Sequence, residues 1–473
     1  MLIEAVIDNN SYDELALLRL VPQNIFSTKK HVEICGGLAE VQNQFSNEDL
    51  VVFKNLLCTR STFAKCITAI YFLSLSGKYE LKQIKVLDIY FKFINNMFKC
   101  EVFSIKKTNA YRLINYSSKL TITAKYITHS LYFFIGIFVN PKFFKNNSYL
   151  RAWVEVSENI HGKDRFRNST IIFYPFPYKL KRQLSFIKYC IKQKYQIGFS
   201  GISYSFIDLI KLLTNMSDKN IVKFEINGYK KHVDLLLKKQ ITHYFTEDDY
   251  DASAFIIANK LIHSGVTCTN TAHGVNQINP FIGASVFEAL TIPQVEHFSS
   301  FKFNKNISFK FQGKKITNKS CLFKNEFGKI NFIFIHGNFK ENEMIYEHNL
   351  QAFALKKIVN YINEENFYIK YHPNGTFREN LKINEIKNNS ELDDIENKCF
   401  ITLNSTSYFH FGESGVFIFI GDDLANPFNI IGKNVPFYKT NELHDMIKYY
   451  SNYLNFLTGF ENQIKHLNLS RQD

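Results

Sequence analysis

The stretch NFYIKYHPNG, residues 366–375, carries a short run of β-forming residues directly into His372 and Pro373 and then breaks at an Asn–Gly pair. Its aromatic and β-branched residues favour a strand over 367–371. A buried strand does not need a histidine at its end, whereas the ligand sites of open parallel sheets lie at the carboxyl ends of strands. The stretch therefore predicts an α/β sheet with a functional histidine at its edge.

The same pattern recurs around this stretch. Strands are expected at 330–335, 399–404 and 416–421. Helices are expected between the strands, the longest at about 343–363. Strands that alternate with helices predict a right-handed parallel sheet. Earlier in the chain, strands expected at 170–175, 241–245 and 266–272 and a helix closed by Gly265 suggest a second sheet of this kind, with residues 220–239 interpreted as strand, loop and helix.

A change in composition suggests the domain boundaries. Residues 301–328 are rich in Lys, Asn, Ser and Phe with poor helical periodicity, so we expect them to link two domains. Residues 1–300 then form an N-terminal Rossmann-like domain, within which residues 1–150 show no motif. Residues 329–440 form a C-terminal Rossmann-like domain. Residues 441–473 are expected to be a helical segment that packs back on the N-terminal domain.

The charge of the chain narrows the classes of partner. Its 57 Lys and Arg residues against 43 Asp and Glu residues give a net charge of +14. This favours nucleic acid, an anionic membrane surface, or a phosphorylated or acidic small molecule. No arginine-rich tract, paired-cysteine finger or basic helical region accompanies the charge, so we do not expect nucleic acid. The eight cysteines form no CxxC pair, and neither a zinc site nor a disulfide framework is expected.

The N-terminus has no basic region followed by an apolar stretch, so no secretory signal is expected. The most apolar segment, SLYFFIGIFV at 130–139, is much shorter than the roughly 20 residues that span a bilayer. It is expected to form a buried strand or helix, or to lie in a membrane interface beside Lys142 and Lys145. We therefore expect a cytoplasmic protein, with peripheral contact to the anionic inner membrane as an alternative.

Polar residues follow several of the expected strands. The candidate site residues are Glu247, Asp248 and Asp249 in TEDDYD, His273 and Gly274 in AHGVN, His336, Gly337 and Asn338 in HGN, His372 and Pro373 in HPNG, and Ser405, Thr406, Ser407 and His410 in STSYFH. Imidazoles, hydroxyls and the backbone N–H groups of a helix start can bind a phosphate, and an acid can act as general base. Each group also has a structural interpretation, because acids stabilise a helix start and Ser or Thr commonly cap one.

The order of these motifs resembles the bacterial GT-B glycosyltransferases of capsule and lipopolysaccharide synthesis, especially those that use CMP-linked sialic acid or Kdo. The resemblance covers about residues 220–425 and rests on short motifs. It implies an α/β, GT-B-like fold in which two Rossmann-like domains with parallel sheets face each other across an interdomain cleft. The N-terminal domain would bind the acceptor, and the C-terminal domain would bind the nucleotide-sugar donor.

The resemblance also implies roles for individual residues. His372, held by Pro373, and the hydroxyls of Ser405, Thr406 and Ser407 would bind the donor phosphate. His273 and Gly274 would line the cleft, and one acid among Glu247, Asp248 and Asp249 would be the base. Two departures are visible. His410 stands where the family commonly has a glutamate, and the acidic loop lacks the glycine of many sialyltransferases.

The implied function is transfer of a sugar from a nucleotide-sugar donor, with CMP-linked donors favoured, to a hydroxyl of a surface-polysaccharide or lipopolysaccharide acceptor. No DxD-type acidic pair requires a metal, so we expect metal-independent, inverting transfer with no cofactor beyond the nucleotide-sugar co-substrate. The expected partners are this donor and a glycan or glycolipid acceptor. Two alternatives stay open: a CDP-polyol phosphotransferase of teichoic-acid type, and a non-catalytic carbohydrate- or nucleic-acid-binding protein.

Overall fold

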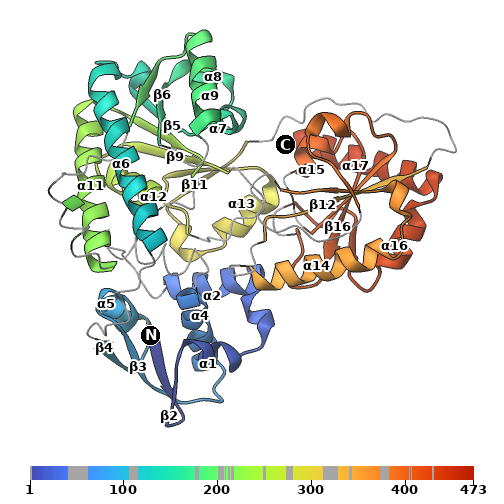
Figure 1. Cartoon of the computed structure of the whole chain (residues 1–473), viewed down its shortest axis with the longest axis horizontal. Helices are drawn as coiled ribbons and strands as arrows, with labels where there is room; N and C mark the ends of the chain where they lie inside the picture. Colours follow the sequence, from blue (N-terminus) through green and yellow to red (C-terminus); the bar gives the residue numbers. More distant parts are fainter. Residues whose placement is uncertain are drawn as a thin grey trace.

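The computed structural model of the chain contains three β-sheets, each packed against helices (Figure 1). The structure describes residues 3–40, 62–105, 116–175, 180–200, 218–248, 252–272, 281–312, 329–339, 344–372, 383–403, 407–428 and 431–472, together with Ile207, Leu209, Ile210, Thr214 and Ser405.

The N-terminal domain covers residues 3–105 and has a mixed four-stranded sheet in the order β2-β1-β3-β4. Its elements are β1 (Ile3–Ile7), β2 (Asn10–Tyr12), α1 (Glu14–Arg19), η1 (Gln23–Phe26), α2 (Thr28–Glu40), α4 (Thr62–Leu75), β3 (Leu81–Leu87), α5 (Asp88–Met97) and β4 (Glu101–Ile105). Alternating burial along β1 places Ile3, Ala5 and Ile7 in a core that α1 and α4 cover. This domain is separate from the Rossmann-like sheet that was expected to begin at residue 1.

The second domain contains a seven-stranded sheet in the order β11-β10-β9-β8-β5-β6-β7. Its elements are α6 (Tyr116–Val139), η4 (Lys145–Asn147), β5 (Ser148–Ala152), α7 (Glu155–His161), α8 (Lys163–Asn168), β6 (Thr170–Phe173), α9 (Leu180–Lys192), β7 (Ile197–Phe199), α11 (Asp218–Lys238), β8 (His243–Thr246), α12 (Ala252–His263), β9 (Thr267–Thr271), β10 (Val286–Ala289), α13 (Ile292–Ser299), η6 (Lys302–Asn304) and β11 (Ser308–Phe311).

The third domain contains a six-stranded sheet in the order β14-β13-β12-β15-β16-β17. Its elements are β12 (Asn331–Ile335), α14 (Ile345–Val359), η7 (Glu364–Asn366), β13 (Phe367–Lys370), β14 (Asn384–Glu385), η8 (Asn389–Leu392), β15 (Lys398–Thr402), α15 (Ser407–Phe411), β16 (Val416–Gly421), β17 (Phe437–Lys439), α16 (Leu443–Tyr450) and α17 (Tyr453–Gln472). All six residues of β16 are buried, as expected of a central parallel strand with helices on both faces.

Both larger sheets have the strand order of doubly wound nucleotide-binding folds. Every pair of neighbouring strands in them is parallel. Counted within its own sheet, the order of the third domain is 3-2-1-4-5-6, and the second domain has the same order with a seventh strand added. The predicted α/β fold with parallel sheets is therefore confirmed, and each sheet is Rossmann-like.

Two segments differ from the sequence-based expectation. Residues 218–238 form the single helix α11 and not a strand, loop and helix, because Tyr229, Val233 and Leu236 are buried at helical spacing. The expected linker at 301–328 begins with η6 and β11, and β11 extends the sheet of the second domain. Residues 313–328 lie outside the described residues.

The C-terminal segment is helical. Helix α17 packs on β16, and Gln463 accepts a hydrogen bond from the Phe417 N–H at 2.7 Å. Leu467 of this helix also belongs to an apolar cluster that includes Phe287 and Phe298 of the second domain. Packing of the segment on residues 1–300 stays a prediction.

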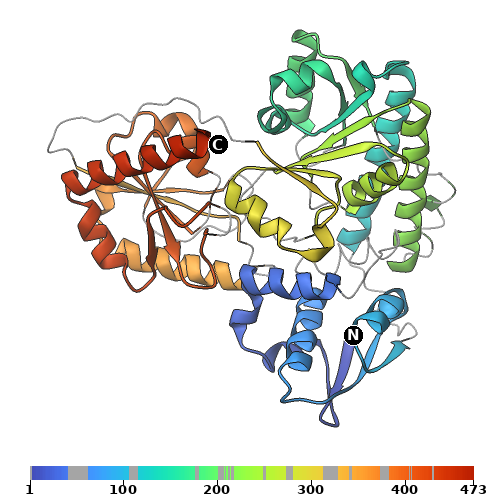
Figure 2. The same ribbon diagram turned by 180° about the vertical axis from the view of Figure 1, so that it is seen from behind.

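The N-terminal domain contacts both Rossmann-like domains (Figure 2). Its core packs against Phe281 and Phe303 of the second domain and Ile345 of the third. At the start of α2, the Thr28 N–H donates a hydrogen bond to the buried carboxylate of Glu347 in α14. A carboxylate at a helix N-terminus interacts favourably with the helix dipole. The N-terminal domain therefore bridges the two larger domains.

The two Rossmann-like domains also share an apolar cluster. It includes Phe287 and Phe298 from the second domain and Phe400 and Phe417 from the third. Helix α13, which carries Phe298, lies between the two sheets (Figure 1). This packing joins the two doubly wound domains through a shared apolar cluster.

Candidate functional site

Several of the predicted site residues lie where a sheet reverses its strand order. In the second domain β5 and β8 are neighbours, and the chain continues from them in opposite directions across the sheet. In the third domain β12 and β15 have the same relation. Doubly wound sheets bind ligands outside the carboxyl ends of the strands at this point. Glu247 and Asp248 follow β8, while His336 and Ser405 follow β12 and β15.

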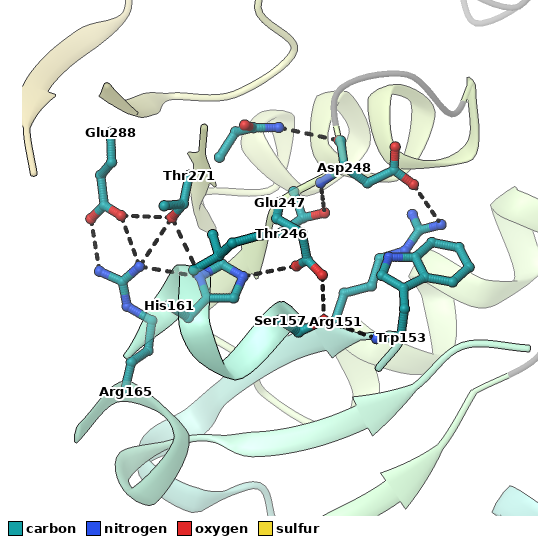
Figure 3. Close-up of polar contacts among 12 residues, drawn as sticks. Arg151, Trp153, Ser157, His161, Arg165, Thr246, Glu247, Asp248, Thr271 and Glu288 are labelled. Carbon is teal, nitrogen blue, oxygen red and sulfur yellow. Dashed lines mark hydrogen bonds and ion pairs between the residues drawn. The ribbon is translucent and has the colours of Figure 1, made fainter. Parts of the chain in front are cut away.

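In the second domain, Glu247 lies in a buried polar network (Figure 3). His161 Nε2 lies 2.9 Å from one carboxylate oxygen of Glu247. The Ser157 hydroxyl donates to the other oxygen and accepts a hydrogen bond from the Trp153 N–H at 3.0 Å. Both oxygens of Glu247 are therefore engaged by side chains of α7.

The network continues from His161 to β10. Thr271 Oγ1, at the end of β9, lies 3.3 Å from His161 Nδ1 and donates a 2.7 Å hydrogen bond to Glu288. The Arg165 guanidinium binds both oxygens of Glu288, at 2.7 and 2.8 Å. Six polar side chains, from Ser157 to Glu288, thus connect the ends of three strands with helices α7 and α8.

Gly162 sets the angle between these two short helices. Its φ of +80° lies in the left-handed region, which residues with a side chain rarely adopt. It ends α7 directly after His161 and precedes α8, which carries Arg165. The turn brings both basic side chains to the same network (Figure 3).

A second group surrounds Arg151, which is completely buried near the end of β5. Its guanidinium carbon lies 3.9 Å from the centre of the Tyr174 ring and 4.6 Å from that of Trp153. One terminal nitrogen lies 3.4 Å from the Asp248 carboxylate. Burial, together with the charge of Arg151, lowers the pKa of His232 to about 3, so this histidine is neutral near pH 7 beside the Tyr174 hydroxyl.

Hydrogen bonds determine the ionisation of the two buried glutamates. Burial alone would raise the pKa of Glu247, but hydrogen bonds from His161 and Ser157 and the charge of His161 outweigh it and lower the pKa below its usual 4.5. Burial opposes ionisation of Glu288 as well, yet hydrogen bonds from Arg165 and Thr271 lower its pKa. Both carboxylates are charged at neutral pH.

We expect Glu247→Gln to make the melting temperature depend less on pH in the acidic range. Because the folded-state pKa of Glu247 is lowered, its contribution is present above the unfolded-state pKa and is lost as pH falls through the folded value. The wild-type melting temperature should therefore fall between roughly pH 6 and pH 3. The variant should melt lower at neutral pH and decline less. The exposed Glu364, replaced by Gln, is the control, and an unchanged pH profile in Glu247→Gln would contradict the expectation.

In the third domain, His336 lies beneath the surface and His372 lies on it. His336 is buried, and the Gln351 side-chain amide lies 2.9 Å from its Nε2. Burial is the main cause that lowers the pKa of His336 to about 4, and the charge of His372 also contributes. His372 is exposed directly after β13, and the pairing of Ile335 with Lys370 places it level with Gly337. His372 is thus the more accessible imidazole of the two.

The serine loop after β15 forms a helix cap. Ser405 Oγ accepts a hydrogen bond from the Ser407 N–H at 3.1 Å at the start of the five-residue α15. This hydrogen bond is of the kind that stabilises a helix start, and phosphate binding by the hydroxyl stays a prediction. The Gly337 N–H, one strand away, donates to Gln351 at 2.7 Å, and Asn338 follows it, partly exposed.

The remaining predicted residues lie outside the described part of the chain. These are Asp249, His273, Gly274, Pro373 and Thr406, together with the side chain of His410. Helix α12 begins at Ala252, so Glu247 and Asp248 precede it and do not lie in its first turn as expected. Dipole stabilisation of α12 therefore does not explain these two acids.

Sequence analysis missed most of the network in the second domain. Ser157 and His161 are four residues apart after a strand, which places them on one side of a helix, and Arg165 follows four residues later. Glu288 is a single acid within the apolar strand β10. These two signals, a polar helical face after a strand and a charge inside one, were available in the sequence.

Two other features of the described residues bear on ligand binding. A hollow of about 710 Å³ lies beside β17, α16 and α17, and its lining includes Tyr438, Tyr449 and Gln463 but no predicted site residue. Within the described ranges, no group of three or more His, Cys, Asp and Glu side chains is arranged to hold a metal ion.

The comparisons with known proteins add a weak likeness. No protein-family model matches the chain, and no curated protein matches it. Among solved structures, the chain is similar to the glycotransferase of kitacinnamycin, with 8% identity over 68% of this chain and 96% of that one and a TM-score of 0.39.

Two further structures show a likeness of the same strength. For the glycosyltransferase SnogD from Streptomyces nogalater the identity is 8%, the coverage 69% and 98%, and the TM-score 0.37. For the spinosyn forosaminyltransferase SpnP the corresponding values are 6%, 68% and 95%, and 0.37. Similarity at this level carries no information about function. The assignment of an α/β fold rests on the strand order of the two sheets.

Proposed function

We propose that this protein is a glycosyltransferase that moves a sugar from a nucleotide-sugar donor to a hydroxyl of a glycan or glycolipid acceptor. One observation carries the proposal: a single chain contains two doubly wound parallel sheets, each with polar side chains where its strand order reverses. Such a position receives nucleotides and their phosphates in folds of this class. Two of them in one molecule suit a reaction between two substrates.

In this proposal the third domain binds the donor. His372 is exposed at the carboxyl end of β13 and would donate a hydrogen bond to the phosphate that leaves with the nucleotide. The loop of Ser405, Thr406 and Ser407, two strands away, would supply hydroxyl and backbone N–H groups to the same phosphate. Buried His336 would position its loop through Gln351.

The acceptor would bind at the end of β8 in the second domain. Ser157 and His161 already engage both oxygens of Glu247, whose lowered pKa weakens it as a base. We therefore assign general-base catalysis to Asp248 or Asp249 and a positioning role to Glu247. His273 and Gly274 remain candidates for residues that line the acceptor site. A base acting directly on the acceptor hydroxyl gives inversion at the anomeric carbon, and we propose that no metal takes part.

The finer identity of the substrates is also a proposal. A CMP-linked sugar such as sialic acid or Kdo is the favoured donor, and capsule or lipopolysaccharide is the favoured acceptor. The protein would work in the cytoplasm at the inner face of an anionic membrane. A CDP-polyol phosphotransferase would use the same phosphate contacts but transfer the phosphate into its product. A non-catalytic binding protein would turn over no donor.

Nucleotide binding is the first test of the proposal. CMP is expected to raise the melting temperature more than CDP, UDP or GDP at equal concentration, because it is the nucleotide of the favoured donor. A ligand that binds only the folded state stabilises it by about 2.7 kcal/mol at a hundredfold excess over Kd. A shift with CDP alone, followed by incorporation of phosphate into product, would identify the phosphotransferase. No shift with any nucleotide and no donor turnover would exclude both enzymes.

A further inference from the structure

Helix α6 exposes an apolar stripe that no described part of the chain covers. Ile127, Leu131, Phe134 and Phe138 follow one another at intervals of four, three and four residues, so they share one helical face. Between 53% and 73% of each of these residues is exposed. The rings of Phe134 and Phe138 lie 5.1 Å apart. Single exposed apolar residues are ordinary, but a continuous row of them marks an interaction surface.

The opposite face of α6 fixes its orientation. Tyr126 and Tyr132 are buried against the second domain. A Cβ on Gly136 would lie 2.4 Å from the Phe199 carbonyl oxygen, so the helix lies directly against edge strand β7. Asn140 then pairs with both backbone groups of Phe199, donating at 2.8 Å and accepting at 2.6 Å. The helix cannot rotate to bury its apolar stripe without breaking these contacts.

The apolar surface widens at the end of α6 and extends to Phe143 after it. Ile137, Val139 and Phe143 are also more than half exposed. Helix α6 lies on the outside of the second domain, in front of its sheet in Figure 1. No helix in the described part of the chain is both long and apolar enough to cross a bilayer. An apolar face on a helix of this kind suits insertion at the level of the lipid headgroups.

Along the chain, the charged residues on either side of this helix are of one sign. Between Glu101 and Glu155 the sequence has eight basic residues and no acid. Lys142 and Lys145 are exposed directly after the helix, and Lys142 Nζ lies 5.4 Å from the centre of the Phe143 ring. Basic side chains beside an apolar face attract anionic lipids. Two copies of the same positive surface would repel each other, so the charge favours a membrane over a second copy of this chain.

We propose that the α6 surface, formed by Ile127, Leu131, Phe134, Ile137, Phe138, Val139, Phe143, Lys142 and Lys145, binds to the surface of an anionic lipid bilayer with α6 lying in the interface. This assigns the membrane contact of the proposed function to a defined surface. It does not depend on the transfer reaction, because lipid binding is measured without donor or acceptor.

Co-sedimentation of the full chain with lipid vesicles tests the proposal. Vesicles of phosphatidylcholine containing roughly one third phosphatidylglycerol should bind the protein, and vesicles of phosphatidylcholine alone should bind it at least about tenfold more weakly. The double variant Phe134→Ser/Phe138→Ser and the double variant Lys142→Glu/Lys145→Glu should each lower binding about tenfold or more. Salt should weaken the binding that depends on the lysines.

Leu454→Ser is the matched control, since Leu454 is 71% exposed on α17, in a different domain. It should bind vesicles like the wild type. All variants replace exposed side chains, so their melting temperatures should match the wild type and show that they fold. Failure of the wild type to bind anionic vesicles, or equal binding by all variants, would overturn the proposal. A dimer in light scattering that the Phe variant dissociates, without vesicle binding, would assign the surface to a second copy.

Discussion

His372→Ala is expected to lower sugar transfer about 10²–10³-fold and to leave the melting temperature unchanged. The loss is the size seen when one preorganised donor to a developing charge is removed. The stability should hold because His372 is exposed at the end of β13, and truncation of an exposed side chain leaves no cavity. Initial rates with a saturating donor and melting curves of the same preparations measure both effects.

His444→Ala provides the matched control for this prediction. The His444 side chain is 63% exposed on α16, away from the carboxyl ends of the sheet, so its removal should change neither rate nor stability. Wild-type turnover by His372→Ala with a donor that the wild type uses would remove the phosphate role from this residue. A lower melting temperature would instead reveal a structural role that its exposure does not suggest.

Arg165→Met is expected to destabilise the second domain by about 2–3 kcal/mol, which is below the usual cost of breaking a fully buried ion pair because the Arg165 side chain is 23% exposed. The guanidinium binds both oxygens of Glu288 and lies 4.5 Å from the centre of the Phe245 ring. Without it, the Glu288 carboxylate stays buried with Thr271 as its remaining hydrogen-bond donor among the contacts described above. The first thermal transition should fall by roughly 10 °C.

Two companion variants separate this effect from a general effect of the substitution. Arg167→Met alters the same helix, but the Arg167 side chain is 63% exposed and 3.9 Å from Asp164, so the loss should be below about 1 kcal/mol. The double variant Arg165→Met/Glu288→Leu should recover part of the lost stability, because it removes the buried charge together with its partner. Equal melting of Arg165→Met and Arg167→Met would show that the ion pair is not buried in solution.

The third domain was the most predictable part of the fold. Its central strands β15 and β16 are runs buried on both faces, and VFIFIG, which was expected at 416–421, forms β16 over those residues. Such strands can be identified from the local sequence, because burial of both faces requires apolar residues at nearly every position. The N-terminal domain was missed, since its strands alternate in burial and belong to a mixed sheet whose partners are distant in sequence.

The candidate site was partly predictable for the same reason. Glu247, His336 and His372 follow strands, and their positions could be inferred from strand ends alone. Arg165 and Glu288 meet only because α8 and β10, more than a hundred residues apart, pack at one edge. Each segment shows that it carries an unusual charged residue, but neither shows that these two residues pair.

The amino-acid sequence by itself determined that two runs of alternating strands and helices form parallel sheets with polar residues after their strands. The reason is that burial of both sheet faces requires apolar strands, so polar side chains are found at the strand ends. Only the tertiary structure decided which of these residues are buried and which are exposed. Side chains of helix α7 contact Glu247 and a side chain of helix α14 contacts His336, and both residues are buried with altered pKa values, whereas His372 stays at the surface.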